Sequence, residues 1–261
     1  MAAAEDELEF LLRSGNRAEL LLMLDETQPL GRYELERQLE ASRRTVTRVL
    51  DALSERGYIE EGDTGYSLTA FGTSVAASYR DCRQQVDLAA EYRPLLGHLD
   101  TRRFDIDPEL LEGADLTVAS DTSPFVVLNR TLELREGATR VREAAPGIEK
   151  QSVEQLAARL RNGDELEMEV ILPPDAVETV GEGDAFAGDH TVAREADAVR
   201  FYVAPEPFSV FVGVMDDTAA LATGEDGKPL ALVESDRPAF REWAEARLDE
   251  FRDAATPLSP D

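Results

Sequence analysis

The sequence predicts an α/β protein (α+β overall), in which a small helical domain, a long helix and a sheet domain follow one another. Three observations lead to this fold class. Residues 1–72 combine helical apolar spacing with two short β-type runs, and residues 73–99 contain few helix breakers. After residue 100, strand-like runs alternate with helical ones, as in an α/β sheet domain. We expect domains at 1–72 and 100–261.

The composition is strongly acidic, with a formal net charge of −27 over 261 residues. The acidic residues are spread along the whole chain rather than gathered in a tail. High salt would screen the self-repulsion of such a surface, and the charge would keep the protein dissolved. The composition therefore resembles that of haloarchaeal proteins, and it favours an archaeal, halophilic source.

Cellular location can be inferred from patterns that a membrane or secreted protein would show. No apolar run approaches the roughly 20 residues of a membrane-spanning helix, and the first residues lack the pattern of a signal peptide. The single cysteine, Cys82, has no partner within the chain for a disulfide. We expect a cytoplasmic protein that does not contact a membrane.

The first domain begins with a helical segment at 16–24, which a Pro-Leu-Gly sequence at 29–31 ends. A short helix at 32–39, a turn at 40–42 and a helix at 43–53 follow, with Ser42 as the N-cap of the last. Two β-type runs, 58–59 and 66–68, can pair across a glycine-containing turn. This is the order of elements in a winged helix-turn-helix.

The helix at 43–53 has the residue types that contact DNA. Its apolar residues share one face, whereas Arg43, Arg44, Thr47 and Arg48 fall on the other, and residues 41–48 contain no acid. A recognition helix contacts base edges with its N-terminal residues, and arginine can bind guanine through two hydrogen bonds. Arg32 and Arg37 are better placed for phosphates. The candidate DNA-binding residues are Arg32, Arg37, Ser42, Arg43, Arg44, Thr45, Thr47 and Arg48.

These features predict a sequence-specific transcription regulator that binds double-stranded promoter DNA. The alternative is a protein-interaction or scaffold module whose winged helix does not touch DNA. The net charge of −27 and the acidic wing tip at Glu61–Asp63 favour this alternative, because both repel phosphates.

Three segments resemble archaeal, and especially haloarchaeal, winged helix-turn-helix transcription regulators: Ser42–Arg48, Leu53–Glu60 and Tyr66–Gly72. The downstream half resembles the effector domain of archaeal regulators of the methanogenesis-regulator type. The matching stretches there are Ala114–Val118, Ser123–Phe125 and Phe240–Ala244. The resemblance implies a DNA-binding headpiece whose activity a C-terminal domain modulates.

The helix expected at 73–99 is a candidate for dimerisation. Val75, Tyr79, Cys82, Val86 and Ala89 recur at spacings of four and three, as in a coiled-coil seam. A homodimer would suit a protein that binds two half-sites. Packing of this helix against its own domain is the alternative, and Cys82 is expected to act as a small apolar residue.

In the second domain we expect strands at 116–120, 124–128, 166–172, 199–203, 208–215 and 230–233. Helices are expected at 148–160 and after Ser235 or Asp236, which would cap the final helix. The final helix should carry an apolar stripe formed by Phe240, Trp243, Ala244, Leu248 and Phe251.

This domain contains no recognisable catalytic motif, so we expect neither an enzyme nor a cofactor. A small-molecule or protein effector is the expected regulator. The candidate ligand-binding residues are Thr122, Ser123, Asn129, Arg130, Phe208 and Phe211, for which turn chemistry or core packing is the alternative. The glycine-rich segment 181–190 suggests an acidic loop, with a divalent ion at Asp184, Asp189 and His190 as a further alternative.

Overall fold

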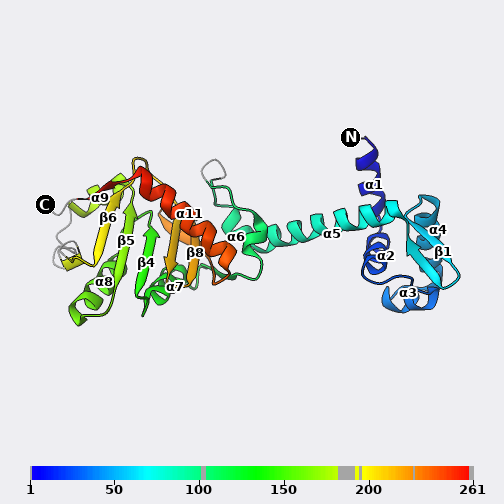
Figure 1. Cartoon of the computed structure of the whole chain (residues 1–261), viewed down its shortest axis with the longest axis horizontal. Coiled ribbons are helices and arrows are strands. Elements are labelled where there is room, and N and C mark those ends of the chain that lie inside the picture. The colour runs from blue at the N-terminus through cyan, green and yellow to red at the C-terminus, as the bar shows by residue number, and fades with distance from the viewer. Residues whose placement is uncertain (1, 101–103, 182–191, 194–195, 226, 259–261) are drawn as a thin grey trace. The chain divides into compact units, whose positions relative to one another are not determined.

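The computed structural model describes residues 2–100, 104–181, 192–193, 196–225 and 227–258. Their contacts divide the chain into two compact units, Met1–Asp87 and Leu88–Asp261 (Figure 1). The division into three parts that the sequence suggests stays a prediction. Among the described residues, no helix is both long enough and apolar enough to cross a membrane. The segment around Asp184, Asp189 and His190 lies outside the described residues.

The first unit is a winged helix-turn-helix. Its elements are α1 (Ala2–Leu12), α2 (Gly15–Glu26), α3 (Arg32–Gln38), α4 (Arg43–Glu55), β1 (Ile59–Gly62), β2 (Gly65–Leu68) and most of α5 (Ala70–Glu91). β1 and β2 form an antiparallel pair, and an isolated bridge joins Leu30 to Tyr66. The leucines and valines that the sequence assigns to the inner faces of α3 and α4 are buried in one cluster with Leu20, Leu21 and Leu24.

The start of α5 is fixed against the wing. The backbone N–H of Gly72 donates to the Thr69 hydroxyl, which itself donates to the carbonyl of Gly57. Gly72 is buried, and a Cβ atom at this position would lie 1.9 Å from the carbonyl oxygen of Tyr58. A glycine is therefore required where α5 passes the base of β1.

The expected linker helix is divided in two. α5 ends at Glu91, and a short helix, α6 (Arg93–Leu96), has Pro94 in its first turn. Val75 and Tyr79 pack against the core of the first unit, whereas Cys82 and Val86 are exposed. The N-terminal half of the expected coiled-coil seam thus packs against its own domain. Dimerisation through the exposed half, Cys82 and Val86, stays a prediction.

The second unit is built on an eight-stranded sheet in the order β10-β6-β5-β4-β7-β8-β9-β3. β4, β5 and β6 are mutually parallel, whereas every other neighbouring pair is antiparallel. The strands are β3 (Asp115–Val118), β4 (Arg140–Ala144), β5 (Glu167–Leu172), β6 (Val199–Val203), β7 (Phe211–Met215), β8 (Thr218–Glu225), β9 (Lys228–Ser235) and β10 (Thr256–Pro257).

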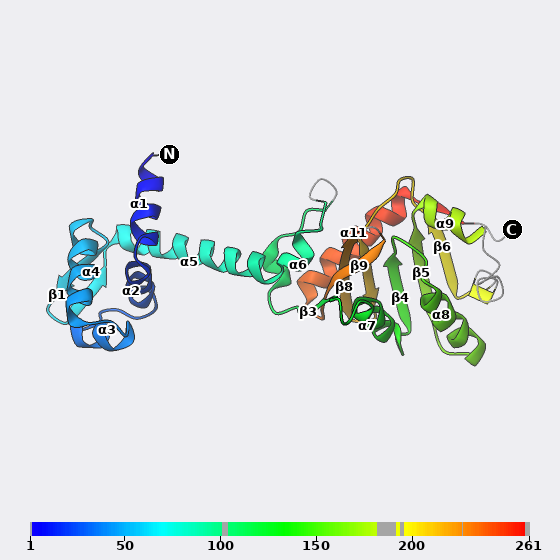
Figure 2. The same cartoon turned by 180° about the vertical axis from the view of Figure 1, so that it is seen from behind.

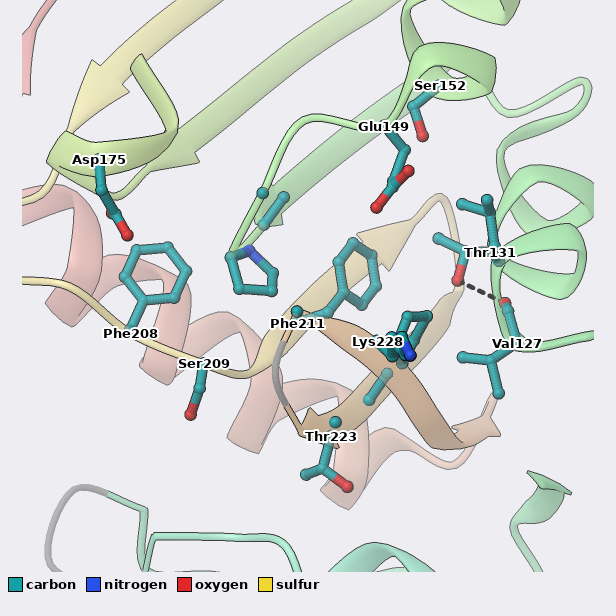
Figure 3. A pocket seen from close by; sticks show the side chains of 18 of the residues that line it. Val127, Thr131, Glu149, Ser152, Asp175, Phe208, Ser209, Phe211, Thr223 and Lys228 are labelled. Atoms are coloured by element: carbon teal, nitrogen blue, oxygen red, sulfur yellow. Dashed lines mark hydrogen bonds between the residues drawn. The ribbon is translucent and has the colours of Figure 1, made fainter. Parts of the chain in front are cut away.

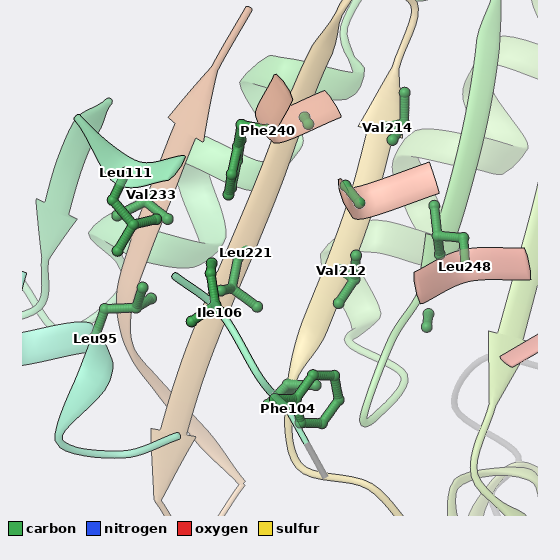
Figure 4. Packing of buried hydrophobic residues seen from close by; sticks show 14 of the residues in the cluster. Leu95, Phe104, Ile106, Leu111, Val212, Val214, Leu221, Val233, Phe240 and Leu248 are labelled. Carbon is green, nitrogen blue, oxygen red and sulfur yellow. The ribbon is translucent and has the colours of Figure 1, made fainter. Parts of the chain in front are cut away.

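Helices cover both faces of this sheet. α11 (Pro238–Ala254) lies on one face, and α7 (Val126–Arg135) and α8 (Lys150–Asn162) lie on the other (Figures 1 and 2). The α11 face buries Phe240, Ala244 and Leu248 against Val212 and Val214 (Figure 4). A short 3-10 helix, η1 (Pro108–Leu111), packs there too, and α9 (Pro174–Gly181) follows β5. Each face therefore has its own apolar core.

Several expected boundaries in this unit are wrong. Residues 126–128 begin α7 rather than a strand, because Val127, Thr131 and Arg135 recur at helical spacing and bury one face. The strand expected at 208–215 starts only at Phe211. α11 is preceded by Arg237, not by the predicted caps, since Ser235 still belongs to β9. The Ser235 hydroxyl instead accepts a hydrogen bond from the backbone N–H of Arg237.

Candidate nucleic-acid interface

The exposed side of α4 presents the candidate DNA-binding residues. The Ser42 hydroxyl accepts from the backbone N–H of Thr45 at 3.2 Å, as predicted for the N-cap of this helix. Val46, Val49, Leu50 and Leu53 are buried. Arg43, Arg44 and Arg48 are exposed, and Thr45 and Thr47 are half-buried beside them. The apolar face thus holds the helix while its cations face outward.

The guanidinium groups at the N-terminal end of α4 make few contacts with other side chains among the described residues. Arg43 Nε lies 3.8 Å from Glu36 Oε1, at the outer limit of an ion pair, and the Arg43 side chain is 81 % exposed. Within the described part of the chain, no ion pair or hydrogen bond involves the side chains of Arg37, Arg44 or Arg48. These three cations are available to phosphates or bases.

Arg32 is held more firmly than the other arginines. One of its terminal nitrogens donates to the Tyr66 hydroxyl at 2.7 Å, and the other lies 3.5 Å from Thr47 Oγ1. The Tyr66 hydroxyl raises the pKa of the Arg32 guanidinium above its ordinary value. Arg32 therefore joins α3, α4 and the wing, and this brings its positive charge next to the N-terminal half of α4.

Two further groups near this surface were not singled out in the sequence. Tyr33 is 78 % exposed in the first turn of α3, one turn before Arg37. Arg48 lines a polar hollow together with Arg13, Arg17 and Arg56, of which Arg13 pairs with Glu9 and Arg56 with Asp6 in the same hollow. The guanidinium groups of Arg17 and Arg56 each lie 4.2 Å from the centre of the Phe10 ring. Residues from α1 reach this hollow only through the tertiary fold, so no local pattern reveals them.

The wing is a tight hairpin with an acidic tip. Glu60, Glu61 and Asp63 are exposed, as the sequence suggests. Gly65 has φ +140°, and a Cβ atom there would lie 2.4 Å from the Leu30 carbonyl oxygen. Glycine is thus required where β2 meets Leu30. The acidic tip offers phosphates no cation.

The candidate ligand-binding residues are divided by the structure. Thr122 and Ser123 belong to an exposed bend, and Asn129 is exposed on α7. Arg130 Nε donates to Glu234 at 2.8 Å, so this guanidinium is occupied. Phe208 and Phe211 instead line one cavity in the second unit. The structure therefore brings together only the two aromatic members of the set.

The chain thus combines a winged helix-turn-helix headpiece, whose helix α4 has an exposed arginine face, with a C-terminal α/β domain. A family described as HVO_A0261 N-terminal domain matches residues 5–91, and one described as methanogenesis regulatory protein FilR1, middle domain, matches residues 124–254. The second match covers half of the chain, so the chain belongs to the family of the methanogenesis regulatory protein FilR1. The resemblance proposed from the sequence is confirmed.

Several solved structures are distantly similar. TrmBL2, an archaeal chromatin protein, is 14 % identical with a TM-score of 0.42, over 97 % of this chain and 100 % of its own. The phosphatidylserine synthase of Haemophilus influenzae Rd KW20 is 11 % identical with a TM-score of 0.38, over 89 % and 48 %. The methyltransferase SibL is 18 % identical with a TM-score of 0.26, over 79 % and 66 %. No curated protein matches the chain.

Proposed function

We propose that this protein is a transcription regulator that binds specific sequences in double-stranded promoter DNA through α4. The observation that carries the proposal is the exposed face formed by Arg43, Arg44 and Arg48, in a chain whose net charge is −27. An exposed cluster of cations on so acidic a protein favours a polyanionic partner. Membership of a regulatory family supports the same function.

In this proposal the front of α4 enters the major groove. Arg44 and Arg48 lie one turn apart on the exposed side of the helix, so both can reach base edges, where arginine can hydrogen-bond to guanine N7 and O6. The Thr47 hydroxyl donates to the Arg43 carbonyl at 2.9 Å, which leaves its methyl group for a thymine methyl. Arg37 and Tyr33 on α3 are the proposed phosphate contacts.

The proposed contacts must overcome repulsion between two polyanions. The Debye length is only about 3 Å in molar salt, so carboxylates remote from the interface add little repulsion there. A contact between a guanidinium group and a base is partly shielded from solvent and is screened much less. Binding is therefore expected to persist in salt that would dissociate a protein attracted to DNA mainly by its overall charge.

The C-terminal domain is proposed to modulate DNA binding through a ligand, a protein partner or dimerisation. An effector can do this only if it binds two conformations with different affinity and these conformations differ in affinity for DNA. The exposed side chains of Cys82 and Val86 on α5 are the proposed dimer contact, which would place two α4 helices on two half-sites.

Selection from a pool of randomised duplexes in molar potassium chloride tests the proposal. The wild-type chain should enrich one motif, and a dimer should enrich two half-sites related by a two-fold axis. Arg44→Glu should abolish the enrichment because it places a carboxylate against the bases. Arg200→Glu is the matched control, since the Arg200 side chain is 56 % exposed on β6, outside the headpiece and the proposed dimer contact.

The outcome also distinguishes the regulator from the scaffold module. If the wild-type chain enriches no motif, or if Arg44→Glu and the wild type enrich the same motif equally, the assignment of α4 as the recognition helix is wrong. Recovery of proteins instead of duplexes by the same immobilised chain would then favour a scaffold, whose acidic wing tip is exposed for cationic partners.

A further inference from the structure

The second unit contains a cavity of about 300 Å³ that no part of the proposed DNA interface uses (Figure 3). Its walls are mainly apolar and include Val127 from α7, Pro146 after β4, the two aromatic rings of Phe208 and Phe211, and Pro229 from β9. An apolar cavity of about 150 Å³ can hold benzene, so this cavity has room for a molecule of roughly 10 to 15 non-hydrogen atoms.

The cavity lies where open α/β sheets bind small molecules. Ala145 follows the carboxyl end of β4, Asp175 follows that of β5 and Phe208 follows that of β6, and all three line the cavity. Phe211 begins β7, which runs antiparallel to β4. The site is thus at the carboxyl edge of the parallel strands, at the position where the parallel half of the sheet meets the antiparallel half. Ligands of open α/β sheets usually bind outside the carboxyl ends of the strands, where the strand order reverses, and here β5 and β7 lie on opposite sides of β4.

A buried ion pair forms part of the cavity wall. Arg135 Nε and Nη2 donate to the two carboxylate oxygens of Glu143 at 2.8 and 2.9 Å, and the two side chains are 9 % and 4 % exposed. The Arg135 guanidinium also lies 5.8 Å from the centre of the Phe211 ring. Arg135 lines both this cavity and a smaller adjoining hollow of about 60 Å³, and Glu143 lines the smaller one.

This ion pair determines the charge that the cavity accepts. Because Arg135 already binds Glu143 with two donors, it offers an entering anion little uncompensated charge. The exposed charged side chains around the cavity, Glu149, Asp175 and Lys228, are of mixed sign (Figure 3). A neutral hydroxyl or carbonyl group can hydrogen-bond at the edge of an ion pair without a net charge being buried.

We propose that this cavity binds an uncharged amphipathic small molecule, with an apolar body against Phe208 and Phe211 and a hydroxyl or carbonyl group near Arg135. Binding itself does not depend on the proposed DNA-binding function; only its role as the effector site rests on that function. The aromatic pair that the sequence suggested thus becomes part of a defined site, whereas Thr122, Ser123, Asn129 and Arg130 do not line it.

Titration of the full chain with the neutral fluorescent dye 2-naphthol, which has 11 non-hydrogen atoms and one hydroxyl group, in molar potassium chloride and without DNA, tests the site. The wild type should bind one dye per chain with saturable fluorescence. Ser152→Phe should weaken binding about tenfold or more, because Ser152 is half-buried and lines both hollows. Ala158→Phe on the exposed surface of the same helix is the matched control and should bind as the wild type does.

Ala145→Leu provides a second way to fill the cavity, from the end of β4 rather than from α8. Circular dichroism and the fluorescence of the only tryptophan, Trp243, identify any variant that has not folded. No saturable binding by the wild type would overturn the proposal. Equal binding by the wild type and a folded Ser152→Phe or Ala145→Leu variant would also overturn it.

Three competitors with the same apolar body test the charge of the occupant: 2-phenylethanol, phenylacetate and 2-phenylethylamine. The alcohol should displace the dye at the lowest concentration. Displacement by phenylacetate or the amine at a concentration about tenfold lower would contradict an uncharged ligand. Failure of all DNA binding with intact dye binding would disprove the regulator but leave the cavity assignment in place.

Discussion

At the scale of single residues, the positions of the α4 arginines could be predicted from the sequence because helical spacing determines which side chains share a face. The role of Arg32 could not. Its partner Tyr66 is 34 residues away in the sequence and reaches it because an isolated bridge joins Tyr66 to Leu30, just before α3. The sequence suggests a phosphate contact, whereas the structure gives this guanidinium hydrogen-bond partners within the unit.

Asp216 offers a test of a single carboxylate. It has φ +49° between β7 and β8, and its carboxylate accepts from the backbone N–H of Arg140 at 2.9 Å and from that of Thr139 at 3.1 Å. Burial alone would raise the pKa of Asp216, but these N–H groups outweigh it and lower the pKa below its ordinary value. This stabilisation is therefore present above about pH 4, the pKa of an unfolded aspartate, and is lost as the pH falls through the folded pKa.

We predict that Asp216→Asn lowers the free energy of unfolding of the second unit by roughly 1 kcal/mol at pH 7, a small value because solvent screens this exposed group. Asparagine tolerates the same positive φ, so the backbone need not change. Thermal unfolding followed by Trp243 fluorescence between pH 3 and 7 measures the effect. The difference from wild type should shrink below pH 4, and Asp217→Asn should change little, since Asp217 makes only an exposed ion pair with Arg241. A pH-independent difference would contradict the account.

At the scale of elements, the strands β5 and β6 and the helices α4, α8 and α11 agree with the sequence-based expectations, whereas β4, β7, β8 and α7 differ from them in part or in full. β8 was missed because Ala219, Ala220 and Ala222 have low strand propensity, although they are buried between two covered faces. The sequence predicts a strand at the start of α7 because Val126 and Val127 are β-branched. In both cases tertiary packing overrides the local preference, which the sequence alone does not reveal.

The junction between the wing and α5 is the element most sensitive to a single methyl group. We predict that Gly72→Ala destabilises the first unit by about 3 kcal/mol or more, because its Cβ would collide with the Tyr58 carbonyl. Hydrogen exchange of α4 and β1, measured by mass spectrometry on the full chain, should become faster. Gly15→Ala is the control, since nothing lies within 4 Å of its added Cβ. Unchanged exchange in Gly72→Ala would mean that this junction does not restrain the headpiece.

At the scale of the whole molecule, a winged helix-turn-helix followed by an α/β sheet domain could be predicted, but the sheet topology could not. β4 lies beside β7 although α8, β5, α9 and β6 separate them in sequence. No local sequence pattern predicts that β4 pairs with β7. This pairing creates the sheet edge at which Phe208 and Phe211 line the same cavity. The two aromatic residues could be proposed as ligand contacts from their side-chain types, but the cavity that they share could not be predicted without the three-dimensional structure.

The central claim is that a few exposed guanidinium groups bind DNA on a molecule whose net charge is −27. The most direct measurement is the affinity of Arg44→Ala/Arg48→Ala for a duplex selected by the wild type, measured by fluorescence anisotropy in molar potassium chloride. Loss of two arginine contacts should weaken binding by about 2 kcal/mol or more, which is roughly thirtyfold.

The matched control is Arg140→Ala/Arg200→Ala, which makes the same change in net charge at two exposed arginines of the second unit. The account predicts near wild-type affinity for this control and the thirtyfold loss for the α4 variant. Equal affinity of the folded α4 variant and the wild type would contradict it.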